Sequence, residues 1–104
     1  MKTQKSKVEI LKDARAAISD PDRWIKGDAS EVRNGKLCLC TLGALTMATG
    51  GGPVGEARLA LVAVLPVGFG STLISEFNDD PDTTHADVLA LFDRAIAAAE
   101  KCHA

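Results

Sequence analysis

Cysteine and histidine are the residues of this sequence best suited to chemistry, and four of them could together bind zinc. Cys38 and Cys40 stand two residues apart, and Cys102 is followed by His103. Thiolates and imidazoles are the usual zinc ligands, and four of them complete a tetrahedral site. The spacing does not match the CxxC knuckle, and residues two apart diverge by about 200° on a helix. These four are therefore weak metal candidates, and we predict no metal and no cofactor.

Cys40 is also a candidate nucleophile. We expect a helix to begin near Leu39, which would place Cys40 in the first turn, where free amide hydrogens favour a thiolate. A base would be required, and His85 could serve, with Asp79 or Asn78 to orient it. The catalytic candidates are therefore Cys40, His85 and Asp79. The competing interpretation is a small buried thiol, because cysteine is among the most buried residue types.

Two further segments resemble ligand-binding motifs without meeting their requirements. GGGPVG, residues 50–55, could cradle an anion, but it has neither the lysine nor the hydroxyl of a P-loop. Asp79, Asp80 and Asp82 could bind a hard cation, but Pro81 interrupts them and no glutamate completes an EF-hand loop. GGGPVG is predicted to be a loop, and the acidic run to be a helix C-terminal stop followed by the cap of the next helix.

The composition indicates one mainly helical domain. A chain of 104 residues fits a single domain over 1–104, with residues 1–5 and 101–104 expected to fray. Hydrophobic residues make up 46% but aromatic residues only 4%, so the core must consist mostly of Ala, Leu, Val and Ile. We predict a mainly α fold, a compact bundle of about five helices with a small β-hairpin near residues 24–40.

The apolar spacing and the start and stop residues locate these elements. Ser6 should cap a first helix through about Ser19, and Asp20-Pro21 should start a short turn that seats Trp24. Asn34-Gly35 is the hairpin signal. Two further helices are expected over about 39–49, ended by the glycines from Gly50, and over 53–65, opened by Pro53. A short helix should run from Ser71 or Thr72 to Asn78. The last helix should begin at Thr84, where Asp87 completes a capping box.

Charge and hydropathy narrow the classes of partner. Residues 1–36 hold nine of the twelve basic residues together with six acidic ones. Because the two signs alternate and no aromatic-basic motif is present, we expect a solvated face more than a nucleic-acid site. No apolar run approaches the roughly 20 residues of a membrane span, and the amino-terminal segment has no secretory apolar region. An odd number of cysteines does not suit a disulfide framework, and the reducing cytosol would keep them as thiols. We therefore predict a cytoplasmic protein without a membrane partner.

The order of three motifs resembles a known family. The motifs are the Cys40, Gly43 and Ala44 pattern, the aromatic-Asn-Asp of residues 77–79, and the Thr-x-x-x-Val of residues 84–88. Together they resemble the small proteins of "domain of unknown function 6197", encoded in actinobacteria and their phages. The resemblance extends from about residue 10 to residue 100. The sequence departs from the family pattern in having Phe77 in place of Trp and in adding Cys38.

The resemblance implies no activity and carries over no catalytic residue, but it draws attention to four positions. Gly43 can permit close helix contact, Asn78 can end a helix in the left-handed conformation, and Asp79 can accept amide hydrogen bonds. Trp24, Asn78 and Asp79 are the candidate binding residues. All of these roles could be architectural, Cys40 included.

Three functions remain open. The first is a small accessory or regulatory protein, phage-encoded or actinobacterial, that binds another protein, such as a host protein, or associates with itself as a homo-oligomer. The second is an enzyme or small-ligand binder centred on Cys40 with Asn78, Asp79 and His85. The third is nucleic-acid binding through the basic segment 1–36, which we expect least.

Overall fold

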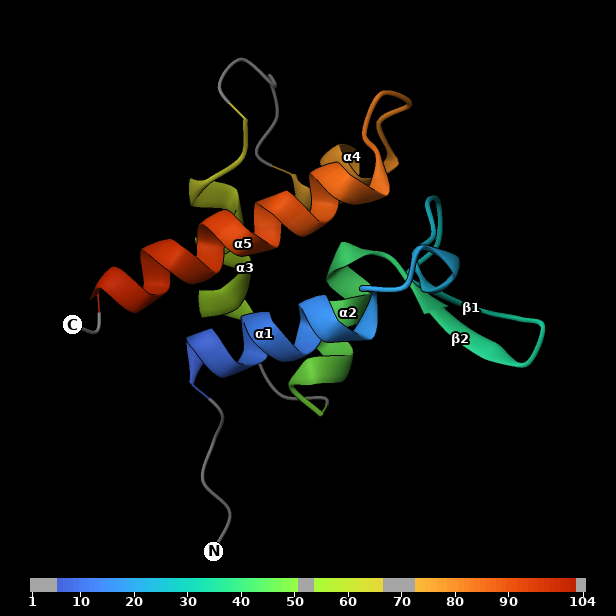
Figure 1. Ribbon diagram of the computed structural model, residues 1–104, viewed down its shortest axis with the longest axis horizontal. Coiled ribbons are helices and arrows are strands. Elements are labelled where there is room, and N and C mark those ends of the chain that lie inside the picture. The colour runs from blue at the N-terminus through green and yellow to red at the C-terminus, as the bar shows by residue number, and fades with distance from the viewer. Residues whose placement is uncertain (1–5, 51–53, 67–72, 103–104) are drawn as a thin grey trace, which may run out of the picture.

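The computed structural model describes residues 6–50, 54–66 and 73–102. Within these ranges the chain forms five α-helices, a short 3-10 helix and one β-hairpin, which confirms the predicted mainly α fold (Figure 1). The elements are α1 (Lys7–Ala17), η1 (Pro21–Arg23), β1 (Ser30–Arg33), β2 (Lys36–Leu39), α2 (Thr41–Ala48), α3 (Gly55–Ala63), α4 (Ile74–Asp79) and α5 (His85–Cys102).

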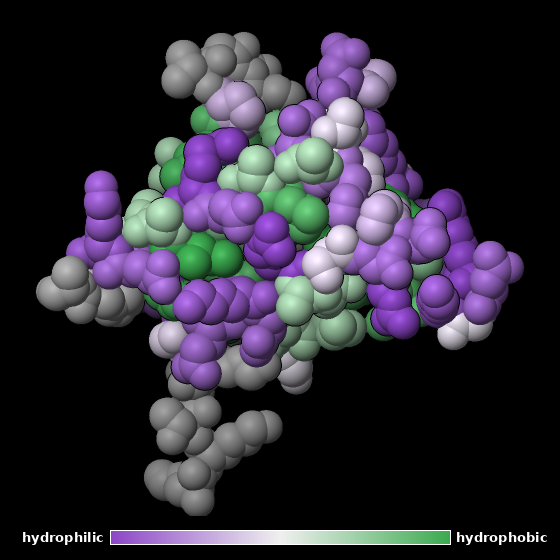
Figure 2. All heavy atoms as spheres, in the orientation of Figure 1, coloured by the Kyte–Doolittle hydropathy of each residue, from purple (hydrophilic) through white to green (hydrophobic). Residues whose placement is uncertain are grey.

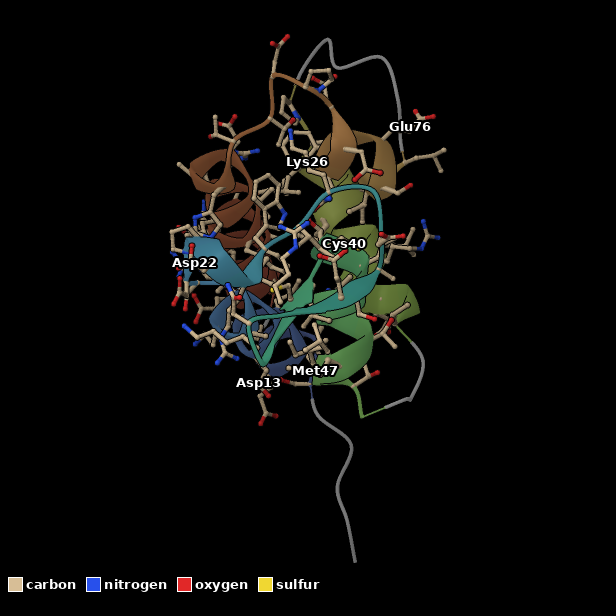
Figure 3. All side chains as sticks on the ribbon, turned by 90° about the vertical axis from the view of Figure 1, so that its right-hand side faces the viewer. Asp13, Asp22, Lys26, Cys40, Met47 and Glu76 are labelled. Carbon is tan, nitrogen blue, oxygen red and sulfur yellow. The ribbon has the colours of Figure 1, made fainter. Side chains whose placement is uncertain are left out.

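The helices form two layers with the core between them. Figures 1 and 3 show α1 and α5 side by side in one layer, with α2, α3 and α4 in the other. The largest fully buried side chains come from both layers, among them Leu11, Leu45, Leu61 and Phe92. Figure 2 shows a mostly hydrophilic outer face, with apolar atoms visible where α1 and α5 run together. The apolar residues that recur at helical spacing in the sequence thus form one core between the two layers.

The predicted helix caps are present. The Ser6 side chain accepts a hydrogen bond from the Glu9 amide at 3.1 Å, and Glu9 accepts one in return from the Ser6 amide. At the start of α5, the Asp87 amide donates to Thr84 Oγ1 at 3.1 Å and the Thr84 amide donates to the Asp87 carboxylate at 3.0 Å. Both pairs satisfy amides that the first helical turn leaves free.

The hairpin forms at the predicted turn. Asn34 and Gly35 adopt φ values of 51° and 76°, as a two-residue turn between antiparallel strands requires. Strands β1 and β2 pair Val32 with Leu37 and Glu31 with Cys38. The short helical turn predicted at Asp20-Pro21 also forms: Asp20 caps η1, and Trp24 follows it directly. The hairpin projects from the helical layers (Figure 1).

Helix α2 begins at Thr41, two residues later than the sequence predicts. Leu39 is held in β2 opposite Ser30, and its carbonyl accepts a hydrogen bond from the Ile25 amide at 3.1 Å. The backbone therefore stays extended through Cys40, whose φ and ψ are −82° and 179°. Cys40 is consequently the N-cap of α2 and does not lie in its first turn.

Several expected boundaries lie outside the described residues. These are Pro53, Ser71, Thr72 and the glycines at 51 and 52. Both helices begin later than predicted: Val54 is the N-cap of α3, which starts at Gly55, and Leu73, whose backbone is extended, is the N-cap of α4, which starts at Ile74. Residues 101 and 102 continue α5, whereas 1–5 and 103–104 are outside the description. No helix in the described ranges is long and apolar enough to cross a membrane.

Candidate functional site

An apolar groove lies between the hairpin and α2. Its volume is about 340 Å³, and we call it the hairpin–α2 groove. Met47 at its rim is 48% exposed and Leu37 on β2 is 41% exposed. In Figure 3, Cys40 and Met47 mark the two ends of α2 behind the hairpin. The groove is lined by Ala29, Ser30, Leu37, Leu39, Leu42, Gly43, Thr46 and Met47.

The apolar face of the hairpin extends beyond this groove. Val32, opposite Leu37 in the strand pair, is 68% exposed, the largest fraction among the exposed large hydrophobic residues of the described ranges. Side chains alternate between the two faces of a strand, so Val32 and Leu37 share the face of Ser30 and Leu39, which line the groove. Groove and hairpin together form one exposed apolar surface. This surface is the candidate binding site of the described residues.

A buried junction centred on Asn78 fixes the base of the hairpin. Asn78 lies on α4 with 0% exposure. Its Oδ1 accepts hydrogen bonds from Trp24 Nε1 at 2.7 Å, from the Thr41 amide at 3.0 Å and from Thr41 Oγ1 at 2.7 Å. Its Nδ2 donates to the Ile25 carbonyl at 3.0 Å and to Asp79 Oδ1 at 2.9 Å. One amide side chain therefore joins α4, the start of α2 and the segment before the hairpin.

The loop that leads into β1 is held by the end of α4. The Gly27 amide donates to Asp79 Oδ1 at 2.9 Å, at a glycine whose φ of 90° disfavours other residues. Lys26 Nζ donates to the Asp80 carbonyl at 2.5 Å and lies 5.6 Å from the centre of the Trp24 ring. The predicted role of Asp79 as an acceptor of amide hydrogen bonds is therefore confirmed.

Gly43 and Cys40 hold α2 against the same loop. The Cys40 amide donates to the Ala29 carbonyl at 3.1 Å, and Cys40 Sγ accepts from the Gly43 amide at 3.3 Å. A Cβ at position 43 would lie 2.1 Å from the Ala29 oxygen, closer than any side chain can approach. This confirms the expected close contact at Gly43, although the neighbour is a loop carbonyl and not a helix.

A family model described as "Family of unknown function (DUF6197)" matches residues 2–98. The chain belongs to this family. Comparison with curated proteins and with solved structures finds no match.

Two of the three motifs that resemble the DUF6197 pattern meet at the junction. Cys40 and Gly43 hold the loop before β1, Asn78 joins three segments, and Asp79 anchors Gly27. In this DUF6197 protein, therefore, four separated positions build one architectural joint beneath the groove. The expected left-handed conformation of Asn78 is wrong: it lies inside α4, and Asn34 is the non-glycine residue with positive φ in the described ranges. The buried Asn78 amide has five partners, which an exposed helix end would not supply.

The three catalytic candidates have different partners. Cys40 is 8% exposed and bonds to Gly43, while Asp79 bonds to Gly27 and Asn78. His85 Nε2 lies 2.6 Å from the Ile18 carbonyl oxygen, and its half-buried ring stands 5.8 Å from that of Trp24. Among the described residues no hydrogen bond joins any two of the three candidates. Catalysis at Cys40 stays a prediction, testable through the reactivity of its thiol.

The described ranges contain no group of three or more His, Cys, Asp or Glu residues placed to bind a metal. Cys38 is buried and its thiol donates to the Asp22 carbonyl at 3.2 Å. The side chain of Cys102 and all of His103 lie outside the description. The structure therefore shows Cys38 and Cys40 as free, buried thiols, each with a hydrogen-bond partner of its own.

Several basic residues of segment 1–36 are neutralised by acids. Arg15 Nε lies 2.7 Å from Asp93 Oδ1, and Arg33 pairs with Glu31 on β1. The hydrogen bond and the charge of Glu31 raise the pKa of Arg33. Lys12 Nζ lies 3.1 Å from Glu100. Paired cations present a weaker field to nucleic acid than unpaired ones, and nucleic-acid binding through this segment stays a prediction.

The hairpin–α2 groove is the part of the site that sequence reasoning missed. A signal for it exists, because the predicted turn at Asn34-Gly35 places Val32 opposite Leu37, and apolar residues paired on a projecting hairpin are exposed. No comparable pattern in the sequence predicts that Met47 lines the groove or that α2 closes it.

Proposed function

We propose that this protein is a small cytoplasmic accessory or regulatory protein, actinobacterial or phage-encoded, that acts by protein–protein interaction through the hairpin–α2 groove and the exposed hairpin face. The observation that carries the proposal is the continuous apolar surface made by Val32, Leu37 and Met47, each more than 40% exposed. Exposed apolar patches with polar rims are typical of interaction sites.

The size and lining of the groove suit a side chain of another protein. A volume of about 340 Å³ lies at the lower end of the range for ligand pockets, and the lining is mostly apolar. Burying a large aliphatic side chain contributes about 1.5–3 kcal/mol. Docking of an apolar anchor between Leu37 and Met47 would therefore supply the kind of central contact that dominates interface energies.

The junction beneath the groove supports the same function. Asn78 is buried and joins the segments that carry Trp24, Ile25 and Thr41, so the hairpin base and the start of α2 are held together. A binding surface built on such fixed elements loses little conformational entropy when its partner docks. The polar motif residues thus act as the support of the surface, and the apolar residues above them as the contact.

Site-specific photocrosslinking tests the proposal. A photoreactive phenylalanine analogue replaces Met47 in the groove or, as the control, Leu59 on α3, which is 58% exposed and is not part of the groove. In actinobacterial cells we expect a defined crosslinked species from position 47, and its loss when Leu37→Glu is added. Equal crosslinking from positions 47 and 59, or no effect of Leu37→Glu, would contradict the proposal. Unchanged circular dichroism of each variant verifies its fold.

A further inference from the structure

The outer edge of β1 is a strand edge without a partner in the described ranges. In an antiparallel pair, the backbone groups of successive residues point alternately toward the partner strand and away from it. Cys40 donates to the Ala29 carbonyl, and the Leu39 carbonyl accepts from Ile25 on the opposite side of β2. Continuing this alternation along the ladder directs the N–H and C=O of Val32 away from β2.

Another segment of the chain lies against the β2 edge of the hairpin, whereas the β1 edge has no such neighbour in the described ranges. Residues 24 and 25 lie beside Leu39, through a parallel bridge and the Ile25 hydrogen bond, and so cover the base of β2. In the described ranges no backbone hydrogen bond reaches Ser30–Arg33 from a segment other than β2. Uncovered edges are places where another strand can add, and charged residues on them restrict which strand that is.

The charges along β1 are complementary to themselves. Glu31 and Arg33 flank Val32, with 39% and 58% of their side chains exposed. If a second β1 runs antiparallel with Val32 opposite Val32, each Glu31 stands opposite an Arg33. A parallel, in-register pairing would oppose Glu31 to Glu31 and Arg33 to Arg33, and like charges opposite each other destabilise a strand pair. The charge pattern therefore selects the antiparallel pairing.

We propose that β1 pairs with β1 of a second copy of this chain, antiparallel about a two-fold axis at Val32. This inference rests on the proposed function, since it names the partner that occupies the hairpin part of the surface. The resulting four-stranded sheet would carry one apolar row of Leu37, Val32, Val32 and Leu37, because each Val32 already stands opposite Leu37. The pairing is isologous, so it closes as a dimer and leaves no β1 edge free.

A second copy of β1 accounts for the exposure of Val32 and matches the charges beside it. Val32 is 68% exposed in the single chain, and it would become the centre of the interface. The reciprocal Glu31 and Arg33 pairs arise when the added strand has the sequence of β1 itself, which an unrelated apolar segment would not provide. A partner of different sequence at this edge is therefore the alternative that the experiment separates.

Charge reversal tests the pairing. The variants Glu31→Arg and Arg33→Glu each place like charges opposite each other. We therefore expect each variant alone to dimerise about tenfold more weakly than wild type. Mixed in equal amounts, the two variants restore both cross-strand pairs and should form a heterodimer. Neither variant keeps the Glu31–Arg33 pair within its own chain, so recovery on mixing reports the contact between chains. Sedimentation velocity over a concentration series measures each species.

Lys12→Glu and Glu100→Arg provide matched controls. They make the same charge changes at an ion pair on α1 and α5, away from β1, with side chains 55% and 53% exposed. We expect both to dimerise as wild type does, and their mixture to gain nothing. A second readout is hydrogen exchange of the Val32 amide, which should become protected as the wild-type concentration rises.

Several results would overturn the inference. These are a wild type that stays monomeric throughout the series, a charge-reversed mixture that forms no more dimer than its components, or a Val32 amide that exchanges freely in the dimer. The proposed function fails differently, through the absence of specific crosslinks from position 47. A monomeric wild type that still crosslinks from position 47 would leave the proposed function standing with a partner other than a second copy.

Discussion

Replacing Asn78 with alanine should remove a large part of the stability of this domain. The substitution leaves the Thr41 amide and hydroxyl, Trp24 Nε1 and the Ile25 carbonyl without their partner. Thr41 is 0% exposed, so water cannot reach its groups without rearrangement. A buried polar group left unpaired costs about 1–3 kcal/mol. The two groups of Thr41, the Ile25 carbonyl and the smaller share of the half-buried Trp24 give an expected loss of at least about 3 kcal/mol.

This loss is large relative to the whole. A domain of this size has a free energy of unfolding of about 5–15 kcal/mol. At about 4–8 °C per kcal/mol, the melting temperature should fall by at least about 12 °C. Thermal and urea denaturation followed by far-ultraviolet circular dichroism and by Trp24 fluorescence measure the change, and coincident transitions verify two-state unfolding. Ser75→Ala, at an exposed position of the same helix, should stay within about 0.5 kcal/mol of wild type.

Asn78→Asp refines the experiment because it keeps the shape of the side chain. An oxygen then replaces Nδ2 and faces two acceptors, the Ile25 carbonyl and Asp79 Oδ1. Burial and the Asp79 charge should raise the pKa of the introduced carboxyl above its value of about 3.9 in the unfolded chain, and we expect them to outweigh the three donors at Oδ1, which favour the charged form. A raised folded-state pKa means that stability is lost as pH rises through it, so the deficit relative to wild type should be greater at pH 7 than at pH 4. A loss below about 1 kcal/mol for Asn78→Ala, or a pH-independent deficit for Asn78→Asp, would refute the reasoning.

Three further predictions concern the elements around the junction. Gly43→Ala should destabilise by about 2 kcal/mol or more in urea denaturation, because its Cβ would lie 2.1 Å from the Ala29 oxygen, whereas Gly55→Ala, with nothing within 4 Å, should be neutral or stabilising. Cys40, at 8% exposure, should resist alkylation in the folded chain and react on unfolding, as followed by peptide mass spectrometry; rapid labelling of the native protein would favour the nucleophile hypothesis. Thr84→Ala should cost about 1 kcal/mol of unfolding free energy through loss of its cap to Asp87; an unchanged melting temperature would argue against that cap.

Local patterns predicted most of the elements. The Ser6 and Thr84 caps and the Asn34-Gly35 turn are each decided within a few residues, by groups that bond to their own neighbourhood. The start of α2 was misplaced because a longer-range contact decides it. Leu39 pairs with a strand and with Ile25, and this extended pairing overrides the helical spacing that begins there.

In the candidate site, too, the sequence predicted some features and tertiary contacts decided the others. The motif reading drew attention to Cys40, Gly43, Asn78 and Asp79, yet it could not show that they meet, since about 35 residues of chain separate the two pairs. It also assigned Asn78 a left-handed conformation, which is a local role. Its observed role is to satisfy buried donors on other segments, and those donors are specified by the packing of α4 against α2.

The sequence by itself determined the helical class, the hairpin turn, the capping residues and the family, because each depends on spacing or on short motifs along the chain. Tertiary structure decided what those motifs do. It buries Asn78 among partners from two distant segments and places a loop carbonyl against Gly43. It also leaves Val32, Leu37 and Met47 exposed on one apolar surface. Burial and exposure depend on which segments meet in space, and that information becomes available when the chain is packed.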